Sequence, residues 1–468
     1  MRVVFKFGGT SLANGERIRH AAELVKNYLP DNKIVVVCSA MGDTTDNLLW
    51  AIDAAVNGDK KRVDDVLSEL SSLHLEAIDK AVSVDSIKRE IYSRISENIG
   101  NLSQVLHSIY FLREATPRTR DYVLSFGERM SSRIMYGALM SLRIEAKYLE
   151  GGEAGIITDS SFGEAQPIME VAQKQVRERV GGLLERNITP VVTGFIGMTV
   201  DGAVTTLGRG GSDYTATIIA YAINAEEVWL WSDVDGLMTT DPRIVNDARV
   251  LPEISFEEAM EMALFGAKGL HPRALEPARM GNIRVRIKNT FNPSAPGTLI
   301  SESARGIDSV VKAVLLVRDV AMITLRGASV VGRAGTAGRI LSTLGRLGIN
   351  IMMISQSVSE SALSFIVKRK ASGIVVSELE REFVKSGQLK EVECEPDVSV
   401  IAVIGGGMRG TPGVASRVFG AVAKRGISIR MIAQGSSELN ISFVVKEKDG
   451  EEAVKAIHEE YGLGSLKL

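Results

Sequence analysis

The sequence has only two cysteines, Cys38 and Cys394, and their wide separation matches neither a disulfide framework nor a zinc-ligand spacing. Five scattered histidines form no Ser-His-Asp, Cys-His or HExxH arrangement, which argues against the hydrolase and zinc-enzyme classes. No apolar run approaches the ~20 residues of a membrane span, and the N-terminus does not resemble a signal peptide. The 55 basic and 57 acidic residues nearly balance, so no nucleic-acid or membrane partner is expected. We therefore expect small-molecule ligands and a cytoplasmic location.

The pattern that is present is typical of an α/β protein. A chain of 468 residues is expected to form two to four compact units. Over the first 300 residues, short β-rich runs alternate with longer amphipathic stretches, which predicts a mainly parallel sheet with helices on both faces. The predicted strands are 2–7, 34–39, 143–149, 189–196, 227–232 and 283–288. A helical insertion is expected between 60 and 140, and another helix over 212–224 with Ser212 or Asp213 as its N-cap.

The C-terminal third of the chain is a duplication. Pro, Gly and Ser cluster over 292–310, which predicts a linker. Beyond it, residues 332–368 align with 410–446 without a gap at a constant offset of 78. Each copy predicts a strand, a glycine turn, a helix, a strand, a turn and a strand. Because two copies are too few for a solenoid, we expect paired α+β modules.

Two glycine-rich turns are candidate anion sites. The first predicted strand runs into Lys6-Phe-Gly-Gly-Thr-Ser11, where an ammonium group lies beside a glycine-bared backbone that suits phosphate oxygens. The spacing is not that of a Walker loop, and a surface lysine before a tight turn is the plainer alternative. The segment Thr206-Leu-Gly-Arg-Gly-Gly-Ser-Asp213 opens a helix, whose N-terminal amides attract anions. Arg209 adds a bidentate donor for a carboxylate, which a simple N-cap does not explain, so a ligand site is favoured here.

Three further stretches carry candidate groups. Ser125-Phe-Gly-Glu128 has a glycine inside a helical pattern, which costs about 1 kcal/mol relative to alanine and indicates close approach of another group. Glu128 suits an ammonium ligand, and a solvated helix face is the alternative. Residues 231–243 leave a strand for a carboxylate-rich loop, a place where parallel sheets bind ligands. Lys268 supplies another cation, and His271 before Pro272 is expected at a helix start.

Together these stretches resemble the aspartokinases of the amino-acid kinase family. The shared motifs are KFGGTS at 6–11, SAMGDTTD at 39–46, SFGE at 125–128, GRGGSD at 208–213, SDVDGLMTTDPR at 232–243 and FGAKGLHP at 265–272, and the repeats resemble ACT domains. The resemblance implies an α/β amino-acid kinase fold, a three-layer αβα arrangement around a mainly parallel central sheet, followed by two α+β ACT (βαββαβ) domains. It implies a catalytic domain over 1–300, a first ACT domain within 301–396 and a second over 397–468. In that arrangement residues 320–395 are inserted, and a strand at 309–317 belongs with the second copy.

The family's reaction transfers the γ-phosphate of ATP to the side-chain carboxylate of L-aspartate, normally with Mg²⁺, and opens the branch to lysine, threonine, methionine and isoleucine. This carboxylate is already ionised near pH 7, so the reaction needs no general base. Catalysis then depends on holding two anions in line and neutralising the transferring phosphoryl group. By resemblance, Lys6 stabilises that group beside the amides of Gly8 and Gly9, and Asp213 orients the catalytic groups or the metal.

The resemblance also implies the two substrate sites. The aspartate site comprises Thr45, Glu128, Arg209, Gly210, Gly211 and Ser212. Within it, Arg209 grips the α-carboxylate and Glu128 the α-ammonium group. The nucleotide site comprises Lys6, Phe7, Gly8, Gly9, Ser232, Asp233, Met238, Arg243, Lys268 and Gly269, and no side chain is assigned as a metal ligand. Two positions depart from the family pattern: Ser232 stands where threonine is usual, and Met238 stands where tyrosine is common.

The effector is inferred from the repeats. Gln356 and Gln434 resemble residues implicated in threonine-regulated relatives, and Met352 stands where lysine-regulated bacterial enzymes tend to carry an acidic residue. The resemblance therefore implies threonine rather than lysine, although glutamines that only satisfy strand ends are the alternative. ACT modules usually pair across chains, which implies a homodimer or a higher homo-oligomer.

Two rival functions fit parts of the pattern. A glutamate or acetylglutamate kinase would form a similar acyl phosphate, but the long helical insertion and the ACT pair argue against it. A catalytically silent amino-acid sensor is the alternative from another class, and Lys6, Arg209 and Asp213 argue against that. We expect no homoserine dehydrogenase domain, because the second repeat extends nearly to residue 468.

Overall fold

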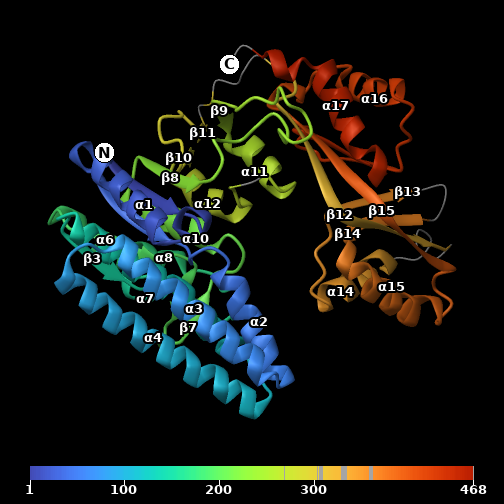
Figure 1. The fold of residues 1–468 in the computed structure, drawn as a ribbon. Coiled ribbons are helices and arrows are strands. Elements are labelled where there is room, and N and C mark those ends of the chain that lie inside the picture. The colour runs from blue at the N-terminus through green and yellow to red at the C-terminus, as the bar shows by residue number, and fades with distance from the viewer. Residues whose placement is uncertain (268, 303, 305–308, 328–334, 358–361, 467–468) are drawn as a thin grey trace. The chain divides into compact units, whose positions relative to one another are not determined.

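The computed structural model describes residues 1–267, 269–302, 304, 309–327, 335–357 and 362–466. The chain divides into two compact units, each described by itself (Figure 1). Unit 1 comprises Met1–Leu237, Pro252–Phe256 and Lys268–Ala304, and unit 2 comprises Met238–Leu251, Glu257–Ala267 and Arg305–Leu468. Within the described ranges, none of the helices is both long enough and apolar enough to cross a membrane.

Unit 1 is built on an eight-stranded sheet of order β3-β5-β2-β1-β8-β10-β11-β9. Its strands are β1 (Arg2–Phe7), β2 (Lys33–Cys38), β3 (Ala146–Leu149), β5 (Thr189–Thr193), β8 (Glu227–Ser232), β9 (Glu253–Ser255), β10 (Arg284–Asn289) and β11 (Thr298–Ser301). In the described chain, the only antiparallel pair of this sheet is β10 with β11. The central strand β1 pairs Phe7 with Cys38 on one side and with Trp231 on the other. The carboxyl ends of β2, β1 and β8 therefore meet at one edge of the sheet.

Helices cover both faces of this sheet. One face carries α1 (Gly15–Tyr28) and α6 (Phe126–Ser141), which share a core with β1 and β2. Outside them lie α2 (Thr44–Asn57), α3 (Lys60–Ala81), α4 (Asp85–Leu112) and α5 (Pro117–Leu124) (Figure 1). The last three of these fall within 60–140, where a helical insertion was expected. The other face carries α8 (Met169–Val176), α9 (Gly182–Glu185), α10 (Gly211–Ile223) and α12 (Pro272–Met280). The result is the predicted three-layer αβα architecture.

Unit 1 also contains a small second sheet. It has the order β4-β6-β7, with strands β4 (Ile157–Thr158), β6 (Ile196–Thr199) and β7 (Val204–Thr206), and α7 (Gly151–Ala154) precedes it. The predicted strand over 189–196 is split into β5 and β6, because Phe195 adopts a φ of 65° and turns the chain out of the main sheet. The expected N-cap of the next helix is wrong as well. The cap of α10 is Gly210 with a φ of 73°, so Ser212 and Asp213 lie inside the first turn.

Unit 2 contains a six-stranded sheet of order β13-β14-β12-β15-β17-β16. Its strands are β12 (Ala313–Arg326), β13 (Met353–Ser357), β14 (Ala362–Lys368), β15 (Glu391–Ile404), β16 (Met431–Gln434) and β17 (Asn440–Lys446). Its helices include α14 (Thr336–Arg346), α15 (Ser372–Leu379), α16 (Val414–Lys424) and α17 (Gly450–Glu460). The duplication is visible in the register, since Gln356 pairs with Leu363 as Gln434 pairs with Ile441. Each copy buries its own apolar core.

Strand β12 is shared between the two copies. Its first part pairs with the end of β15, as in Ala313 with Ile404, and its second part pairs with β14, as in Arg326 with Ala362. A register irregularity between Val317 and Val320 separates the two parts. One strand therefore contributes to both modules.

Two segments that precede residue 300 belong to unit 2 rather than to the expected catalytic domain. The first, Met238–Leu251, accepts a hydrogen bond at the Thr239 carbonyl from the Val314 amide at 2.8 Å. The second includes most of α11 (Phe256–Leu264), where the buried Glu258 carboxylate lies 2.8 Å from the Lys312 ammonium group. Both segments form hydrogen bonds or ion pairs with residues after 305. The two units are therefore not separated at a single point near residue 300, as the sequence predicted.

Candidate active site

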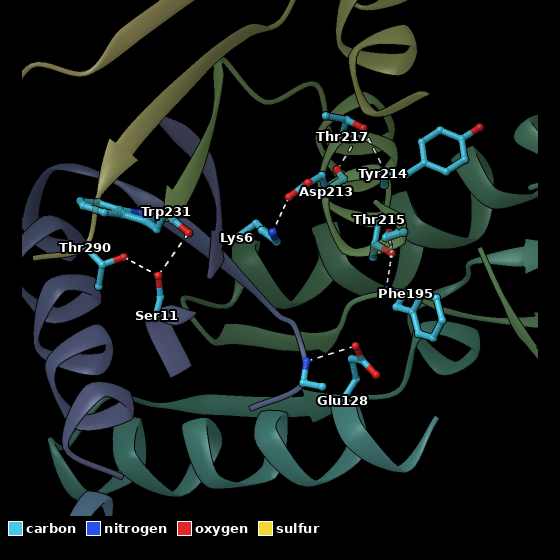
Figure 2. A network of polar contacts seen from close by, with 12 residues as sticks. Lys6, Ser11, Glu128, Phe195, Asp213, Tyr214, Thr215, Thr217, Trp231 and Thr290 are labelled. Carbon is cyan, nitrogen blue, oxygen red and sulfur yellow. Dashed lines mark hydrogen bonds and ion pairs between the residues drawn. The ribbon is translucent and has the colours of Figure 1, made fainter. Parts of the chain in front are cut away.

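Lys6 and Asp213 form an ion pair at the carboxyl edge of the main sheet. Lys6 lies on β1, Asp213 lies in the first turn of α10, and the ammonium nitrogen is 2.5 Å from Oδ1 of the carboxylate (Figure 2). Both side chains are about one-eighth exposed, at 13% and 12%. The pair is thus shielded from most solvent yet still reachable by a ligand. Its two charges neutralise each other.

A cleft of about 290 Å³ surrounds this pair and brings distant motifs together. It is lined by Lys6, Gly9, Ser39, Ala40, Gly42, Thr45, Glu128, Phe195, Gly208, Arg209, Gly210, Gly211, Ser212 and Asp213. The whole predicted aspartate site and both predicted catalytic residues are among these residues. The prediction misses Ser39, Ala40, Gly42, Phe195 and Gly208 as site residues, although the SAMGDTTD motif contains the first three and the GRGGSD motif contains Gly208.

Glu128 is buried in the wall of this cleft. Its side chain accepts a hydrogen bond at Oε1 from the Ala40 amide at 3.1 Å, while Oε2 has no partner among the described residues (Figure 2). Burial raises the pKa of Glu128 to about 8, against the opposing effects of the Ala40 amide and the Lys6 charge. The alternative of a solvated helix face is therefore wrong. A buried carboxyl with a free oxygen is suited to receive a cationic ligand group.

The glycine next to Glu128, which is the second residue of α6, has a steric reason. A Cβ atom at Gly127 would lie 2.8 Å from the Ala40 Cβ, closer than real side-chain contacts allow. Glycine thus lets α6 approach the loop after β2 closely enough for the Ala40 amide to reach Glu128. The predicted close approach is confirmed.

The Arg209 loop is held from outside the cleft by a buried carboxylate. Oδ2 of Asp121 accepts hydrogen bonds from the amides of Gly163 and Thr206, both at 2.9 Å, and Oδ1 accepts one from the Thr206 hydroxyl at 2.8 Å. Gly208 and Gly210 adopt φ values of 75° and 73°, so the loop makes its turn on glycines on either side of Arg209. The exposed Arg209 guanidinium has no protein partner in the described part of the chain and is free to bind a ligand.

At two of the predicted nucleotide positions, Phe7 and Gly8, the group that could contact the nucleotide already contacts Trp231. The ring of Phe7 is buried and stacks on Trp231, with centroids 5.9 Å apart, so it belongs to the core. The Gly8 amide donates to the Trp231 carbonyl at 3.1 Å. Our expectation that this amide supports the phosphoryl group is corrected accordingly, because a single N–H cannot serve both partners well. No local motif indicates this bond, which joins residues 223 positions apart.

The remaining nucleotide positions fall in both units. Gly269, with a φ of 82°, comes close to Ser232, whose Oγ would lie 3.5 Å from a Cβ at that glycine. Asp233 is exposed next to Ser232. In unit 2, Met238 forms a β-bridge with Val250. Lys268 lies outside the described residues.

Arg243 is already paired. Its exposed guanidinium donates to the Asp241 carboxylate, from Nη2 at 2.6 Å and from Nε at 3.0 Å. This pairing raises the pKa of Arg243, chiefly through the hydrogen bond with Asp241. Arg243 would have to share or exchange this partner to bind a phosphate.

His271, which the sequence predicts only as a helix start, lies next to the site. It does precede α12, but its side chain makes no capping bond. The ring instead lies against Gly210, where a Cβ would come within 2.4 Å of it, and its Nδ1 is buried with no partner among the described residues. Burial lowers the pKa of His271, opposed by the negative charge of Asp213. The signal in the sequence is its place in the FGAKGLHP motif.

The predicted effector glutamines occupy equivalent edge strands. Gln434 on β16 lines a pocket of about 330 Å³ together with residues of the 408–415 turn, Glu438 and Ile441. Gln356 on β13 is exposed. The turn equivalent to 410–412 in the first copy falls within 328–334, outside the described residues.

Another depression, of about 460 Å³, lies at the opposite edge of unit 1. It is formed by the amino ends of β8 and β10, near Glu226 and Arg284. It contains none of the predicted site residues. The described residues also contain no cluster of three or more His, Cys, Asp or Glu side chains suited to a metal ion.

The fold and the cleft define a class of protein: a kinase of small carboxylic acids that carries a duplicated sensory module. In agreement, the model of the Amino acid kinase family matches residues 1–289, and the model of the ACT domain matches residues 323–383 and 401–461. Aspartokinase 3, chloroplastic, of Arabidopsis thaliana is 36% identical over 463 residues, which cover 98% of this chain and 81% of that protein. The chain belongs to the aspartokinases of the amino acid kinase family.

Solved structures support the same assignment. E. coli aspartokinase III in complex with aspartate and ADP, in the R-state, superposes with a TM-score of 0.83 at 29% identity. The match covers 98% of this chain and 99% of that one. The same enzyme in complex with lysine and aspartate, in the T-state, gives a TM-score of 0.81 with equal identity and coverage. The predicted family, fold class and kinase activity are thus confirmed.

Proposed function

We propose that this aspartokinase holds its substrate and the reacting phosphate in the cleft around Lys6 and Asp213, with the residue roles implied by the sequence. In the reaction, a β-carboxylate oxygen of L-aspartate attacks the γ-phosphorus of ATP. The bond from that phosphorus to the β,γ-bridging oxygen breaks, giving 4-phospho-L-aspartate and ADP. The observation that carries the proposal is the convergence of Lys6, Glu128, Arg209 and Asp213, from three separate segments, on one cleft.

The charges of the cleft match both ends of the amino acid. Arg209 offers a free bidentate donor to the α-carboxylate. Glu128 presents its unpartnered Oε2 to the α-ammonium group, and Thr45 and Ser212 add hydroxyl groups in the first turns of α2 and α10. With both α-groups bound, the side-chain carboxylate is left as the nucleophile. Its position relative to Lys6 then decides the reaction.

Lys6 is proposed to neutralise the phosphoryl group during transfer. Its ammonium group has three donors, so it can keep its bond to Asp213 and still donate to phosphate oxygens. Asp213 thereby orients the Lys6 ammonium group without removing a proton from the substrate. Catalysis of phosphoryl transfer depends mainly on charged groups that are held in position before the reaction.

Asp213 also fits a magnesium ion that arrives with the nucleotide. Mg²⁺ prefers oxygen ligands and is commonly bound through one or two carboxylates together with substrate phosphates. The Asp213 carboxylate lines the cleft, whereas the burial-raised pKa of Glu128 makes that carboxyl a poor magnesium ligand. When bound, the ion would add charge neutralisation at the phosphates.

We further propose that an amino acid, threonine rather than lysine, regulates the enzyme through the ACT modules. The Gln434 pocket supports this, because it offers an amide, the Glu438 carboxylate and backbone groups within the volume of a small amino acid. The T-state structure of the E. coli relative contains lysine, so lysine is the alternative that the experiment must include.

We also propose that the protein forms a homodimer or a higher oligomer and is located in the cytoplasm. Its reaction is proposed to be the first step in the synthesis of lysine, threonine, methionine and isoleucine.

The test is an ATP-dependent hydroxamate assay on the full chain with aspartate, glutamate and acetylglutamate, each with and without threonine or lysine. We expect turnover of aspartate alone, with inhibition by threonine. Lys6→Ala should lower kcat by about 10²-fold to 10³-fold, the usual cost of losing one charge-stabilising donor. Lys147→Ala, on the exposed face of β3, is the matched control and should retain full activity.

The possible outcomes separate the parts of the proposal. Turnover of glutamate instead of aspartate would refute the substrate assignment. Normal kcat in Lys6→Ala would refute the catalytic role, and inhibition by lysine but not threonine would replace the effector. A strictly monomeric protein in native mass spectrometry would contradict the proposed assembly.

A further inference from the structure

Two buried hydroxyl groups join the two loops beside the phosphate side of the cleft. Oγ of Ser11, just after β1, lies 2.6 Å from Oγ1 of Thr290, just after β10 (Figure 2). Both residues are fully buried. They are 279 positions apart in the chain, so only the folded sheet brings them together.

This pair also ties together the ends of three neighbouring strands. Ser11 Oγ lies 3.4 Å from the Trp231 carbonyl, the same carbonyl that accepts the Gly8 amide at 3.1 Å (Figure 2). The Thr290 amide donates to the Ser232 carbonyl at 2.8 Å. The ends of β1, β8 and β10 are thereby held in one hydrogen-bonded cluster.

Thr290 is in turn held from α1. Its carbonyl lies 2.8 Å from Nε2 of His20. The backbone of Thr290 is therefore held at both its N–H and its C=O. These two contacts orient the residue so that its hydroxyl group points toward Ser11.

The cluster lies at the point where the strand order reverses. From β1, the chain order runs to β2 and β5 on one side and to β8 and β10 on the other. In open parallel sheets, ligands bind in the crevice at the carboxyl ends of the strands at such a reversal. Ser11, Trp231 and Thr290 all lie at those carboxyl ends.

A simpler explanation of the Ser11–Thr290 contact is that two buried hydroxyl groups satisfy each other's hydrogen bonds. This explains the 2.6 Å distance, but it does not explain why the other groups bound to this pair belong to the predicted nucleotide site. Ser11 shares the Trp231 carbonyl with the Gly8 amide, and the Thr290 amide donates to the Ser232 carbonyl. Gly8 and Ser232 are both predicted nucleotide positions. In the described chain, neither hydroxyl contacts Thr45, Glu128 or Arg209 on the aspartate side.

We propose that Ser11 and Thr290 are positioning residues for the nucleotide. Their hydroxyl pair holds the Gly8-Gly9 turn against the end of β8, and so sets where Lys6 and Ser232 meet the ATP phosphates. This inference rests on the proposed function. It extends that function by assigning a role in the reaction to two residues that do not line the cleft.

The experiment compares four variants of the full chain. Thr290→Val and Ser11→Ala each remove one hydroxyl, Thr290→Ser restores it, and the double variant tests coupling. Thr324→Val is the matched control, since its hydroxyl forms a similar pair with Ser364 in unit 2, 3.0 Å apart. For each protein, KM for ATP, KM for aspartate, kcat and the melting temperature are measured, together with ATP affinity by calorimetry without aspartate.

We expect Thr290→Val and Ser11→Ala to raise KM and Kd for ATP about fivefold to tenfold, the effect of losing one buried hydrogen bond. KM for aspartate should stay within about twofold of the wild-type value. Thr290→Ser should restore ATP affinity, and the double variant should be no weaker than the worse single variant, because the two groups act as one pair. Thr324→Val should leave ATP affinity unchanged.

Unchanged ATP affinity in both single variants would overturn the inference. So would an equal rise in KM for aspartate, or a Thr290→Ser protein as weak as Thr290→Val. A wild-type protein that binds ATP but does not phosphorylate aspartate would instead refute the proposed function, and the calorimetry would still decide the role of the pair.

Discussion

At the scale of single residues, Glu128 shows most clearly how the fold changes chemistry. In a peptide its carboxyl group would be ionised at neutral pH. In the protein, burial raises its pKa to about 8, so without a cationic partner the group is mostly a neutral acid at pH 7. An incoming α-ammonium group would favour the ionised form by providing the missing opposite charge. On the role proposed for Glu128, binding of aspartate would be coupled to release of a proton.

This coupling predicts a pH dependence. Because only the ionised form binds the ammonium group well, kcat/KM for aspartate should rise with pH up to about 8 and then level off. Glu128→Gln should lose most of the affinity for aspartate and flatten this limb. Steady-state kinetics from about pH 6 to 9 provide the measurement, with the exposed Glu145→Gln as the control. An unchanged limb in Glu128→Gln would show that another group titrates.

The same group affects stability in a defined direction. Between its ordinary pKa of 4.5 and about 8, the folded protein holds a proton that the unfolded chain has released. The contribution of Glu128 to the free energy of unfolding is thus fully present below pH 4.5 and is lost as pH rises through about 8. Bound aspartate should reduce this loss.

At the scale of elements, two helices each contain a glycine, near the start of α6 and in the middle of α4, but the two glycines have different surroundings. Gly127 in α6 is packed so closely against Ala40 that a Cβ would lie 2.8 Å from its side chain. Gly100 in α4 is exposed, and a Cβ added there would have nothing within 4 Å of it. The sequence shows the same helix-weakening residue in both places. Only the contacts indicate that one glycine is required.

Alanine substitutions should therefore have opposite effects. Gly100→Ala should stabilise the protein by about 1 kcal/mol, the difference in helix propensity. Gly127→Ala should destabilise it by about 1–3 kcal/mol through overpacking and should raise KM for aspartate, since Ala40 donates to Glu128. Urea unfolding followed by fluorescence and steady-state kinetics check both variants. Equal stabilisation by the two substitutions would contradict the steric argument.

At the scale of the whole molecule, unit 2 incorporates part of the kinase sequence through a buried ion pair. Glu258 and Lys312 have side chains that are 2% and 4% exposed, and Oε1 of Glu258 also accepts the Gly406 amide at 2.5 Å. The pair joins α11 to the start of β12 and to the turn before α16. Removing the Lys312 ammonium group takes the opposite charge away from the buried Glu258 carboxylate.

We expect Lys312→Met to destabilise unit 2 by about 3–5 kcal/mol. The matched control is Arg318→Ala, which breaks the exposed pair with Glu451 and should cost at most about 1 kcal/mol. All three tryptophans lie in unit 1, so hydrogen exchange over 311–326 and 398–406 is the appropriate measurement. Similar exchange rates in the two variants would refute the importance of the buried pair.

The sequence by itself indicated the α/β layout and the duplication, because hydrophobic periodicity and a constant 78-residue offset can be read from the order of residues along the chain. Its motifs also indicated the family, through their resemblance to those of aspartokinases. Its motifs, which combine charge with glycine and resemble those of aspartokinases, also predicted Lys6, Glu128, Arg209 and Asp213 as site residues, and the structure brings these four to one cleft. Their roles remain proposals.

Tertiary structure alone decided the rest. It buried Glu128, committed the Gly8 amide to Trp231, brought His271 against Gly210, joined Ser11 to Thr290, and placed 238–251 and 257–267 in unit 2. Each of these facts depends on a partner far away in the chain. Burial, hydrogen-bond choice and pKa arise from such contacts, and no local pattern in the sequence encodes them.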